Sequence, residues 1–216
     1  SPVKARIIVF AALLGSSALV AGCSRRGQIE DGGVYVTRSN CPMPGILAGT
    51  GDVTLFNPVG STDARAIDVV ATITNVRASC TDDGANVTSV VTFDVVSTRR
   101  DAAEARQVVL PYFDVAMQGG STVVAKQTGN IGLNFPAGSI RASTRGQATV
   151  RISKAAATLP ANVLAELTRR RKAGDADAAV DPLSNPTIRD AVARATFEQL
   201  VGFQLTDAQL RYNATR

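Results

Sequence analysis

The side chains that could support acid–base chemistry are few and are spread thinly along the chain. No histidine occurs among the 216 residues, which excludes Ser-His and Cys-His nucleophile pairs and imidazole-bound zinc sites. Neighbouring carboxylates occur at Asp82-Asp83 and at Asp175 and Asp177. Both sets fall in expected loops, whereas general acid–base catalysis needs carboxylates in a cleft that shifts their pKa values. We therefore expect no catalytic residues and no enzyme.

Oxygen ligands for a metal ion are also sparse. Asp175, Asp177 and Asp181 come closest to a calcium-binding set, but their spacing does not supply the six to eight oxygens that calcium takes. The glycine pair within 49–52 precedes no expected helix, so it indicates a turn and not a phosphate-binding loop. The sequence predicts no metal and no cofactor.

Four adjacent cations, Arg169, Arg170, Arg171 and Lys172, are the densest charge in the chain. We expect them to close a helix that starts at Pro160 and stops at Gly174, where cations complement the helix dipole. They are candidates for contact with anionic lipid headgroups or envelope polymers, although such a run is also typical of a solvated helix end. The formal net charge is only +5 and no basic run is interleaved with aromatic residues, so nucleic acid is not an expected partner.

The apolar run 7–20 follows a short basic segment and ends in Leu19-Val20-Ala21-Gly22-Cys23. This ending resembles a bacterial lipobox, in which the signal peptide is removed and the cysteine is acylated, with palmitate among its acyl chains. The resemblance implies a signal peptide over residues 1–22 and a covalent lipid on Cys23. The residue after this cysteine is Ser24 and not aspartate, which by the same resemblance implies an outer-membrane location facing the periplasm. The alternative is an uncleaved inner-membrane anchor, for which the run is shorter than the ~20 apolar residues of a spanning helix.

The cysteine count fits this motif. The chain has three cysteines. Acylation would use Cys23, which leaves Cys41 and Cys80 to pair with each other. We expect these two to form a disulfide in an oxidising compartment. A redox or metal-binding thiol pair is the alternative, and the chain has no histidine to assist it.

Alternating apolar and polar residues predict strands throughout the second part of the chain. We expect a flexible tether over 23–40, with a short strand near 34–36, and a folded domain over 41–216. Two prolines in 41–45 should forbid regular structure there. Strands are expected at 66–76, 87–98, 108–118, 122–127, 132–135, 147–153 and 197–205. In the third of these, Val109, Phe113, Val115 and Met117 share one face.

This pattern predicts a mainly β fold, an antiparallel immunoglobulin- or fibronectin-like β-sandwich. The absence of tryptophan limits the expectation to the architecture. A helical insert is expected near 160–194, including a helix opened by Asn185-Pro186 that carries Ile188 and Val192. A short C-terminal helix should follow the capping box Thr206-Asp207-Ala208-Gln209.

The motifs at 201–206, 209–213, 41–42, 111–113 and 123–126 together resemble a group of uncharacterised proteobacterial outer-membrane lipoproteins with a valine-rich sandwich. That resemblance implies a fold and an address but no activity. We expect an envelope lipoprotein that acts as a non-catalytic binding or assembly module, bound to the membrane by its lipid and to a protein partner in the envelope. The alternatives are an accessory subunit held in a membrane complex by an uncleaved N-terminal helix and, less favoured, an envelope hydrolase using carboxylates or tyrosine.

Overall fold

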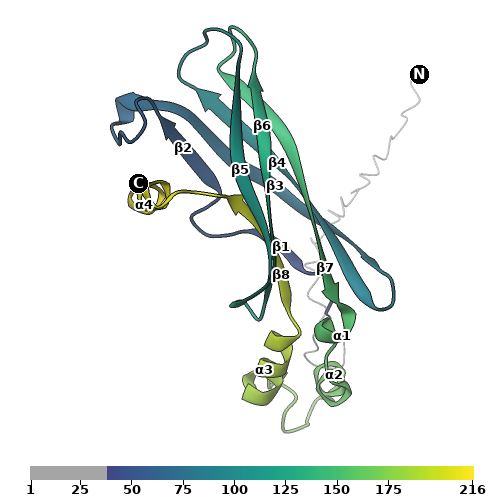
Figure 1. Ribbon diagram of the computed structural model, residues 1–216. Coiled ribbons are helices and arrows are strands. Elements are labelled where there is room, and N and C mark those ends of the chain that lie inside the picture. The colour runs from purple at the N-terminus through teal and green to yellow at the C-terminus, as the bar shows by residue number, and fades with distance from the viewer. Residues whose placement is uncertain (1–37) are drawn as a thin grey trace, which may run out of the picture.

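The computed structural model describes residues 38–216 (Figure 1). Within these residues the fold is mainly β, with eight strands in two four-stranded sheets. The strands are β1 (Met43–Ile46), β2 (Asp52–Phe56), β3 (Ile67–Asp82), β4 (Asn86–Arg99), β5 (Arg106–Gln118), β6 (Thr122–Phe135), β7 (Arg141–Ser153) and β8 (Phe197–Phe203). The helices are α1 (Lys154–Ala157), α2 (Ala161–Thr168), α3 (Pro186–Arg194) and α4 (Asp207–Thr215), and two short 3-10 turns lie at Ala64–Ala66 and Pro182–Ser184.

The two sheets have the orders β2-β3-β4-β7 and β1-β8-β5-β6. In the described part of the chain the strand pairs are antiparallel, except that β1 runs parallel to β8. Two long hairpins dominate, β3–β4 and β5–β6. Their turns contain Gly84 and the pair Gly119-Gly120, all with positive φ, which glycine adopts without steric cost.

Both sheets contribute one face to a common core. The β-branched and aromatic residues at alternate positions point inward, as the period-two pattern of the sequence requires. The core consists of Val53, Val69, Ala71, Ile73, Val91, Phe93 and Val95 from one sheet and Val108, Leu110, Ile131, Leu133, Phe135, Val201 and Phe203 from the other. This shared core joins the two sheets face to face.

Most strand expectations are confirmed, with longer strands than the sequence indicated. The two segments expected at 122–127 and 132–135 form one continuous strand, β6. The strand expected at 66–76 extends to Asp82 as β3, because a bulge between Thr74 and Arg77 lets pairing with β4 continue. Asn75 lies in this bulge with φ 53°, a conformation that asparagine tolerates better than most residues.

The face of β5 that was expected to be buried is buried only in part. Val109 is 56% exposed, whereas its neighbours Val108 and Leu110 lie in the core. Phe113 and Val115 are buried, but they lie on the face of the sheet opposite Leu110. The strand is therefore largely covered on both faces from Phe113 onward, and such burial removes the alternation on which a face assignment depends.

The expectation that the prolines at 41–45 exclude regular structure is also wrong. Met43–Ile46 forms β1, which pairs with β8 and has no neighbour on its other side in the sheet order. An edge strand tolerates proline because one side of its backbone needs no partner. Pro44 therefore lies where a missing N–H can be accommodated.

The helical insert is confirmed and forms a layer at one end of the strands (Figure 1). Leu159, Val163 and Leu167 pack against Ala191 and Ala195 in a small apolar cluster of their own. The opening of α3 is as expected, since the Asn185 side chain accepts a hydrogen bond from Thr187 N. The first helix, α2, differs from the expectation: it ends at Thr168, Pro160 is its N-cap, and Gly174 lies beyond it.

The C-terminal helix α4 lies beside β2, away from the other helices (Figure 1). Its capping box is confirmed, because Gln209 N donates to the Thr206 hydroxyl and Thr206 N donates to the Gln209 side chain. Asn213 donates to the carbonyl oxygens of Gly49 and Asp52. These bonds hold α4 against the start of β2.

Three aromatic rings lie over glycines on the neighbouring strand. Phe93 pairs with Gly146, Tyr112 with Gly129 and Phe113 with Gly202. A methyl group at Gly146 would lie 2.3 Å from the Phe93 ring. At Gly129 and Gly202 the closest ring atoms would be 2.8 and 2.6 Å away. These separations are shorter than van der Waals contact, so each ring occupies space that only glycine leaves open.

Arg99 is a buried cation at the other end of the strands from α1–α3. Arg99 is only 6% exposed. The central carbon of its guanidinium lies 5.2 Å from the centroid of the Phe135 ring. Its guanidinium donates to four carbonyl oxygens, those of Ala103, Glu104, Pro136 and Ser139, at 2.7–3.3 Å. One side chain thereby holds together the β4–β5 and β6–β7 connections.

Candidate functional sites

The predicted lipidation residue, Cys23, lies outside the described residues, as do the signal segment 1–22 and the strand expected near 34–36. Acylation therefore stays a prediction. Among residues 38–216, no helix is both long and apolar enough to cross a bilayer.

The structure contains the disulfide between Cys41 and Cys80 that the cysteine count predicted, with Cα atoms 6.0 Å apart. Cys41 precedes β1 in one sheet, and Cys80 lies in β3 of the other. The bond therefore ties the first described residues to the opposite sheet. Cys80 also packs against the buried cluster of Val87, Ile152, Ala157 and Phe197, a placement typical of a structural disulfide.

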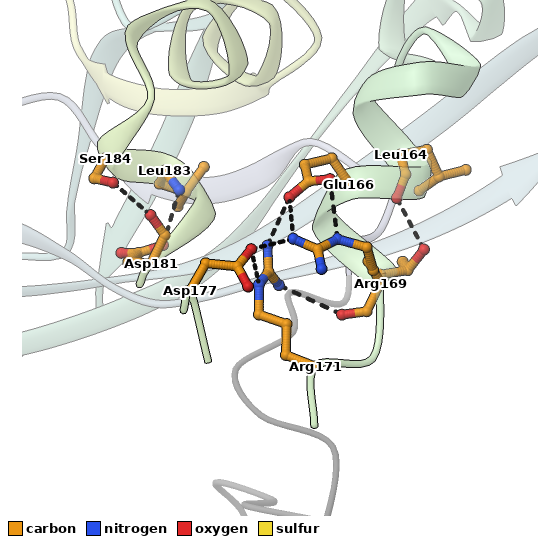
Figure 2. A network of polar contacts seen from close by, with 9 residues as sticks. Leu164, Glu166, Arg169, Arg171, Asp177, Asp181, Leu183 and Ser184 are labelled. Carbon is orange, nitrogen blue, oxygen red and sulfur yellow. Dashed lines mark hydrogen bonds and ion pairs between the residues drawn. The ribbon is translucent and has the colours of Figure 1, made fainter. Parts of the chain in front are cut away.

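The four cations at 169–172 do not act as one cluster. Arg169 and Arg171 turn back onto the fold, where both form ion pairs with Glu166 and Asp177 (Figure 2). Arg171 is only 3% exposed. Hydrogen bonds from Arg169 lower the pKa values of Glu166 and Asp177, so both carboxylates are charged at neutral pH.

Arg170 and Lys172 are exposed and form no ion pair with any residue in 38–216. The expected role of the cluster in closing a helix is wrong, because α2 ends before it. Instead, the cluster splits into an inner pair that stabilises the loop and an outer pair available for contact.

The three aspartates considered for calcium are each used by the fold. Asp175 accepts a hydrogen bond from Lys172 N, and Asp181 accepts one from Leu183 N. Asp177 forms ion pairs with Arg169 and with the buried Arg171. Within the described chain, no group of three or more His, Cys, Asp or Glu side chains is placed to share a metal ion.

A groove of about 560 Å³ lies between β2, the loop that follows it and α4. Apolar side chains line much of it, including Leu55, Phe56 and Val59. The rings of Phe56 and Tyr212 meet edge to face at 5.1 Å. This groove could not be predicted from the sequence, because its walls come from segments separated by more than a hundred residues.

One wall of the groove is polar. Arg106 donates two hydrogen bonds, at 2.8 and 2.7 Å, to the carboxylate of Asp68. These bonds lower the pKa of Asp68, so its carboxylate is charged at neutral pH and cannot donate a proton there. The groove therefore offers apolar contact and hydrogen bonding to a ligand.

A second hollow, of about 690 Å³, lies on the outer face of β3, β4 and β7. Its lining is mostly valine and hydroxyl-bearing side chains, including Val70, Thr72, Val96 and Ser143, with Arg141 at one side. It is lined by no acidic residue. This surface therefore presents mainly aliphatic and hydroxyl-bearing side chains.

The core contains one polar pair that the sequence did not indicate. Gln199 Nε2 donates to Asp114 Oδ2 at 3.0 Å, and the two residues are 0% and 1% exposed. Asp114 Oδ1 and Gln199 Oε1 have no hydrogen-bond partner in the described structure. Burial raises the pKa of Asp114, and the amide of Gln199 opposes this in part.

The chain was compared with models of protein families, with curated proteins and with solved structures, and none of the three comparisons found a match.

Proposed function

We propose that the protein is an envelope lipoprotein, acylated on Cys23, whose two-sheet domain is a non-catalytic binding or assembly module. The disulfide between Cys41 and Cys80 carries this proposal, because such bonds persist in oxidising compartments such as the periplasm. The lipobox at 19–23 then supplies the membrane attachment. The groove beside α4 and the hollow on the outer face of β3, β4 and β7 are the surfaces on which an envelope partner would dock.

We further propose that the fold is immunoglobulin- or fibronectin-like. Within residues 38–216, the first strand pairs in parallel with the last, and the chain passes from β1 in one sheet to β2 in the other; both features support this relation. The meander β2-β3-β4 within one sheet is its least typical element, since immunoglobulin domains place their second and third strands in different sheets.

Mass spectrometry of the protein from membranes tests the attachment. We expect an N-terminal peptide that starts at an acylated Cys23, and we expect globomycin, which blocks removal of lipoprotein signal peptides, to cause a longer precursor to accumulate. A Cys23→Ser variant should leave the membrane fraction. An intact, unmodified N-terminus insensitive to globomycin would instead favour the accessory subunit held by its N-terminal helix.

Crosslinking in intact cells, followed by native purification, tests the binding role. A partner captured by the wild-type protein should be lost from a variant that fills the groove, such as Ser61→Trp, and retained by Ser121→Trp on the exposed β5–β6 turn. Equal capture by both variants would exclude the groove as the docking surface.

A further inference from the structure

The two methionines of the chain lie beside the same glutamate. The sequence contains only Met43 and Met117, which belong to β1 and β5. In the sheet order β1-β8-β5-β6, both strands are neighbours of β8. Met43 is the direct partner of Glu198 from one side, and Met117 is its direct partner from the other. The strand pairing therefore places two thioethers on either side of one carboxylate.

The three side chains lie on the outer face of the sheet. Phe197 and Gln199, the neighbours of Glu198 in β8, are buried between the sheets, and successive side chains point to opposite faces of a strand. Directly paired residues share a face, so both methionines lie on the outer face with Glu198. In agreement, Met43 is 56% exposed, and Met117 and Glu198 are partly exposed.

The spacing of the strands lets the three side chains meet. Neighbouring strands lie about 4.8 Å apart, so the Cα atoms of Met43 and Met117 are separated by roughly 10 Å across β8. Three rotatable bonds in each methionine side chain allow both thioethers to lean over the strand between them. Two sulfur atoms and one carboxylate can thereby converge on a point above Glu198.

The Glu198 carboxylate is available as a ligand. It forms no hydrogen bond or ion pair with any residue in 38–216. Two cations on the adjoining rows of the sheet make other contacts. Arg38 donates to the Thr196 hydroxyl, and the Lys126 ammonium lies 5.6 Å from the centre of the Phe113 ring. No cation of the described chain therefore neutralises this carboxylate.

This set of ligands is suited to a soft, monovalent metal ion. Thioether sulfur is a soft ligand, and soft ligands select Cu(I). Calcium and magnesium take several oxygen ligands, whereas the row supplies one carboxylate. Zinc is bound by thiolate, imidazole and carboxylate, of which the row again has only the carboxylate. A single carboxylate also balances the single charge of Cu(I).

We propose that Met43, Met117 and Glu198 form a Cu(I)-binding site on the outer face of the sheet. Each methionine supplies its Sδ atom, and Glu198 supplies a carboxylate oxygen. Val123, the partner of Met117 on β6, borders the site with an aliphatic side chain. The site does not depend on the proposed acylation, because all three ligands lie in strands of the folded domain.

Titration of the full-length chain with Ag(I), a redox-stable substitute for Cu(I), tests the proposal. Cys23→Ser removes the cysteine outside the disulfide, so that the thioethers are the remaining sulfur ligands. With 13C-methyl-labelled methionine, we expect the Met43 and Met117 signals to shift together and to saturate at one equivalent of Ag(I). Zn(II) at the same concentration should move neither signal.

Matched variants show whether these three residues bind the ion. Met43→Leu and Met117→Leu conserve side-chain volume. Each should weaken Ag(I) binding at least about tenfold, the loss that even a supporting residue causes at a metal site. Glu198→Gln should weaken binding similarly, while both methyl signals still move together. Val123→Leu leaves the three ligands in place, and Glu104→Gln removes an exposed carboxylate from the β4–β5 connection; both should bind as the wild type does.

Anaerobic competition with bicinchoninate, a chelator of Cu(I), repeats the measurement with copper itself. The chain with both methionines should withhold one equivalent of Cu(I) at chelator concentrations where Met43→Leu/Met117→Leu withholds none. Methyl signals that shift at different Ag(I) concentrations would overturn the proposal, as would complete transfer of copper from the chain with both methionines to the chelator. Equal weakening by Glu104→Gln and Glu198→Gln would exclude the assigned carboxylate.

Discussion

Asp114 is a carboxyl group inside an apolar sandwich, and its only described hydrogen bond comes from the Gln199 amide. A neutral carboxylic acid and a primary amide can form two complementary hydrogen bonds, whereas a carboxylate can only accept. Protonation of Asp114 would let it donate to Gln199 Oε1, so that both unpartnered oxygens gain a bond. We therefore expect the folded protein to favour the protonated form of Asp114 more than the unfolded chain does.

The sign of the resulting pH dependence follows from the raised pKa of Asp114. Above the ordinary range of an aspartate, near pH 4, the unfolded chain loses this proton while the folded chain retains it. The contribution of Asp114 to the free energy of unfolding therefore falls as pH rises toward its folded pKa. The amide of Asp114→Asn can form both complementary hydrogen bonds with Gln199 and does not titrate. In urea unfolding, we expect this variant to gain stability relative to wild type between pH 4 and pH 8.

Asp94 provides the control with the opposite sign. Hydrogen bonds from Asn75 and Arg145 lower its pKa, so Asp94→Asn should lose stability relative to wild type as pH rises toward the ordinary aspartate range near pH 4, and the difference should stay constant above that range. A loss of stability in Asp114→Asn at pH 8 would show instead that Asp114 is ionised and that its charge is needed.

Arg99 has a purely structural role that can be measured. Arg99→Ala would leave four carbonyl oxygens without their charged donor, and we expect it to lower the free energy of unfolding by about 3 kcal/mol. The neighbouring exposed Arg100→Ala should change it by less than about 0.5 kcal/mol. Chemical denaturation followed by circular dichroism compares them, and equal effects would contradict this role.

Neither Asp114 nor Arg99 could be identified from the sequence. Both occur in strand segments where a polar residue normally marks the solvent face. The sequence also does not reveal the partner of a buried polar residue when that partner is distant, and Gln199 lies 85 residues from Asp114. The Cys41–Cys80 pair could be predicted because counting cysteines requires no knowledge of the fold.

At the scale of elements, the glycine–aromatic pairs fix how closely neighbouring strands pack. Gly146→Ala would place a methyl group 2.3 Å from the Phe93 ring, and Phe93 is 1% exposed, so a shift of the ring would disturb the surrounding core. We expect a loss of about 1–3 kcal/mol, the usual cost of overpacking a core. Thermal unfolding followed by circular dichroism provides the measurement.

Gly132 is the matched control, since it also lies in a strand but its nearest contact would be the flexible Gln107 side chain at 3.4 Å. Gly132→Ala should be neutral or slightly stabilising, because alanine restricts the unfolded chain more than glycine does. A melting temperature lowered equally by both variants would mean that strand conformation, and not the ring contact, decides the effect.

The long strands could be predicted because one face of each meets a common core, which imposes a two-residue period on the sequence. β1 and β2 could not, since they contain only four and five residues and too few alternations to distinguish them from loops. The end of α2 was missed for a different reason. Arg169 and Arg171 form ion pairs with Glu166 and Asp177 where the chain would otherwise continue the helix, and the sequence does not reveal these pairs.

At the scale of the whole molecule, the disulfide joins two sheets that also share a core. In the chain-entropy estimate, a bond across 39 residues stabilises the fold by about 4 kcal/mol. We expect Cys41→Ser/Cys80→Ser to lose roughly that amount in urea unfolding. Cys23→Ser should unfold like the wild type, and a double variant as stable as wild type would show that the core alone sets the stability.

The position of the disulfide also determines how the molecule would respond to tension. If a bound partner moves while the N-terminus is held by lipid, force enters the fold at Cys41 and passes through the sulfur–sulfur bond into β3. The span between Cys41 and Cys80, 39 residues along the chain, then bears no load. At about 3.6 Å per residue, roughly 140 Å of polypeptide could not be pulled out. β1 and β2 would therefore keep their places under a pull that could strip an unlinked N-terminal strand from its sheet.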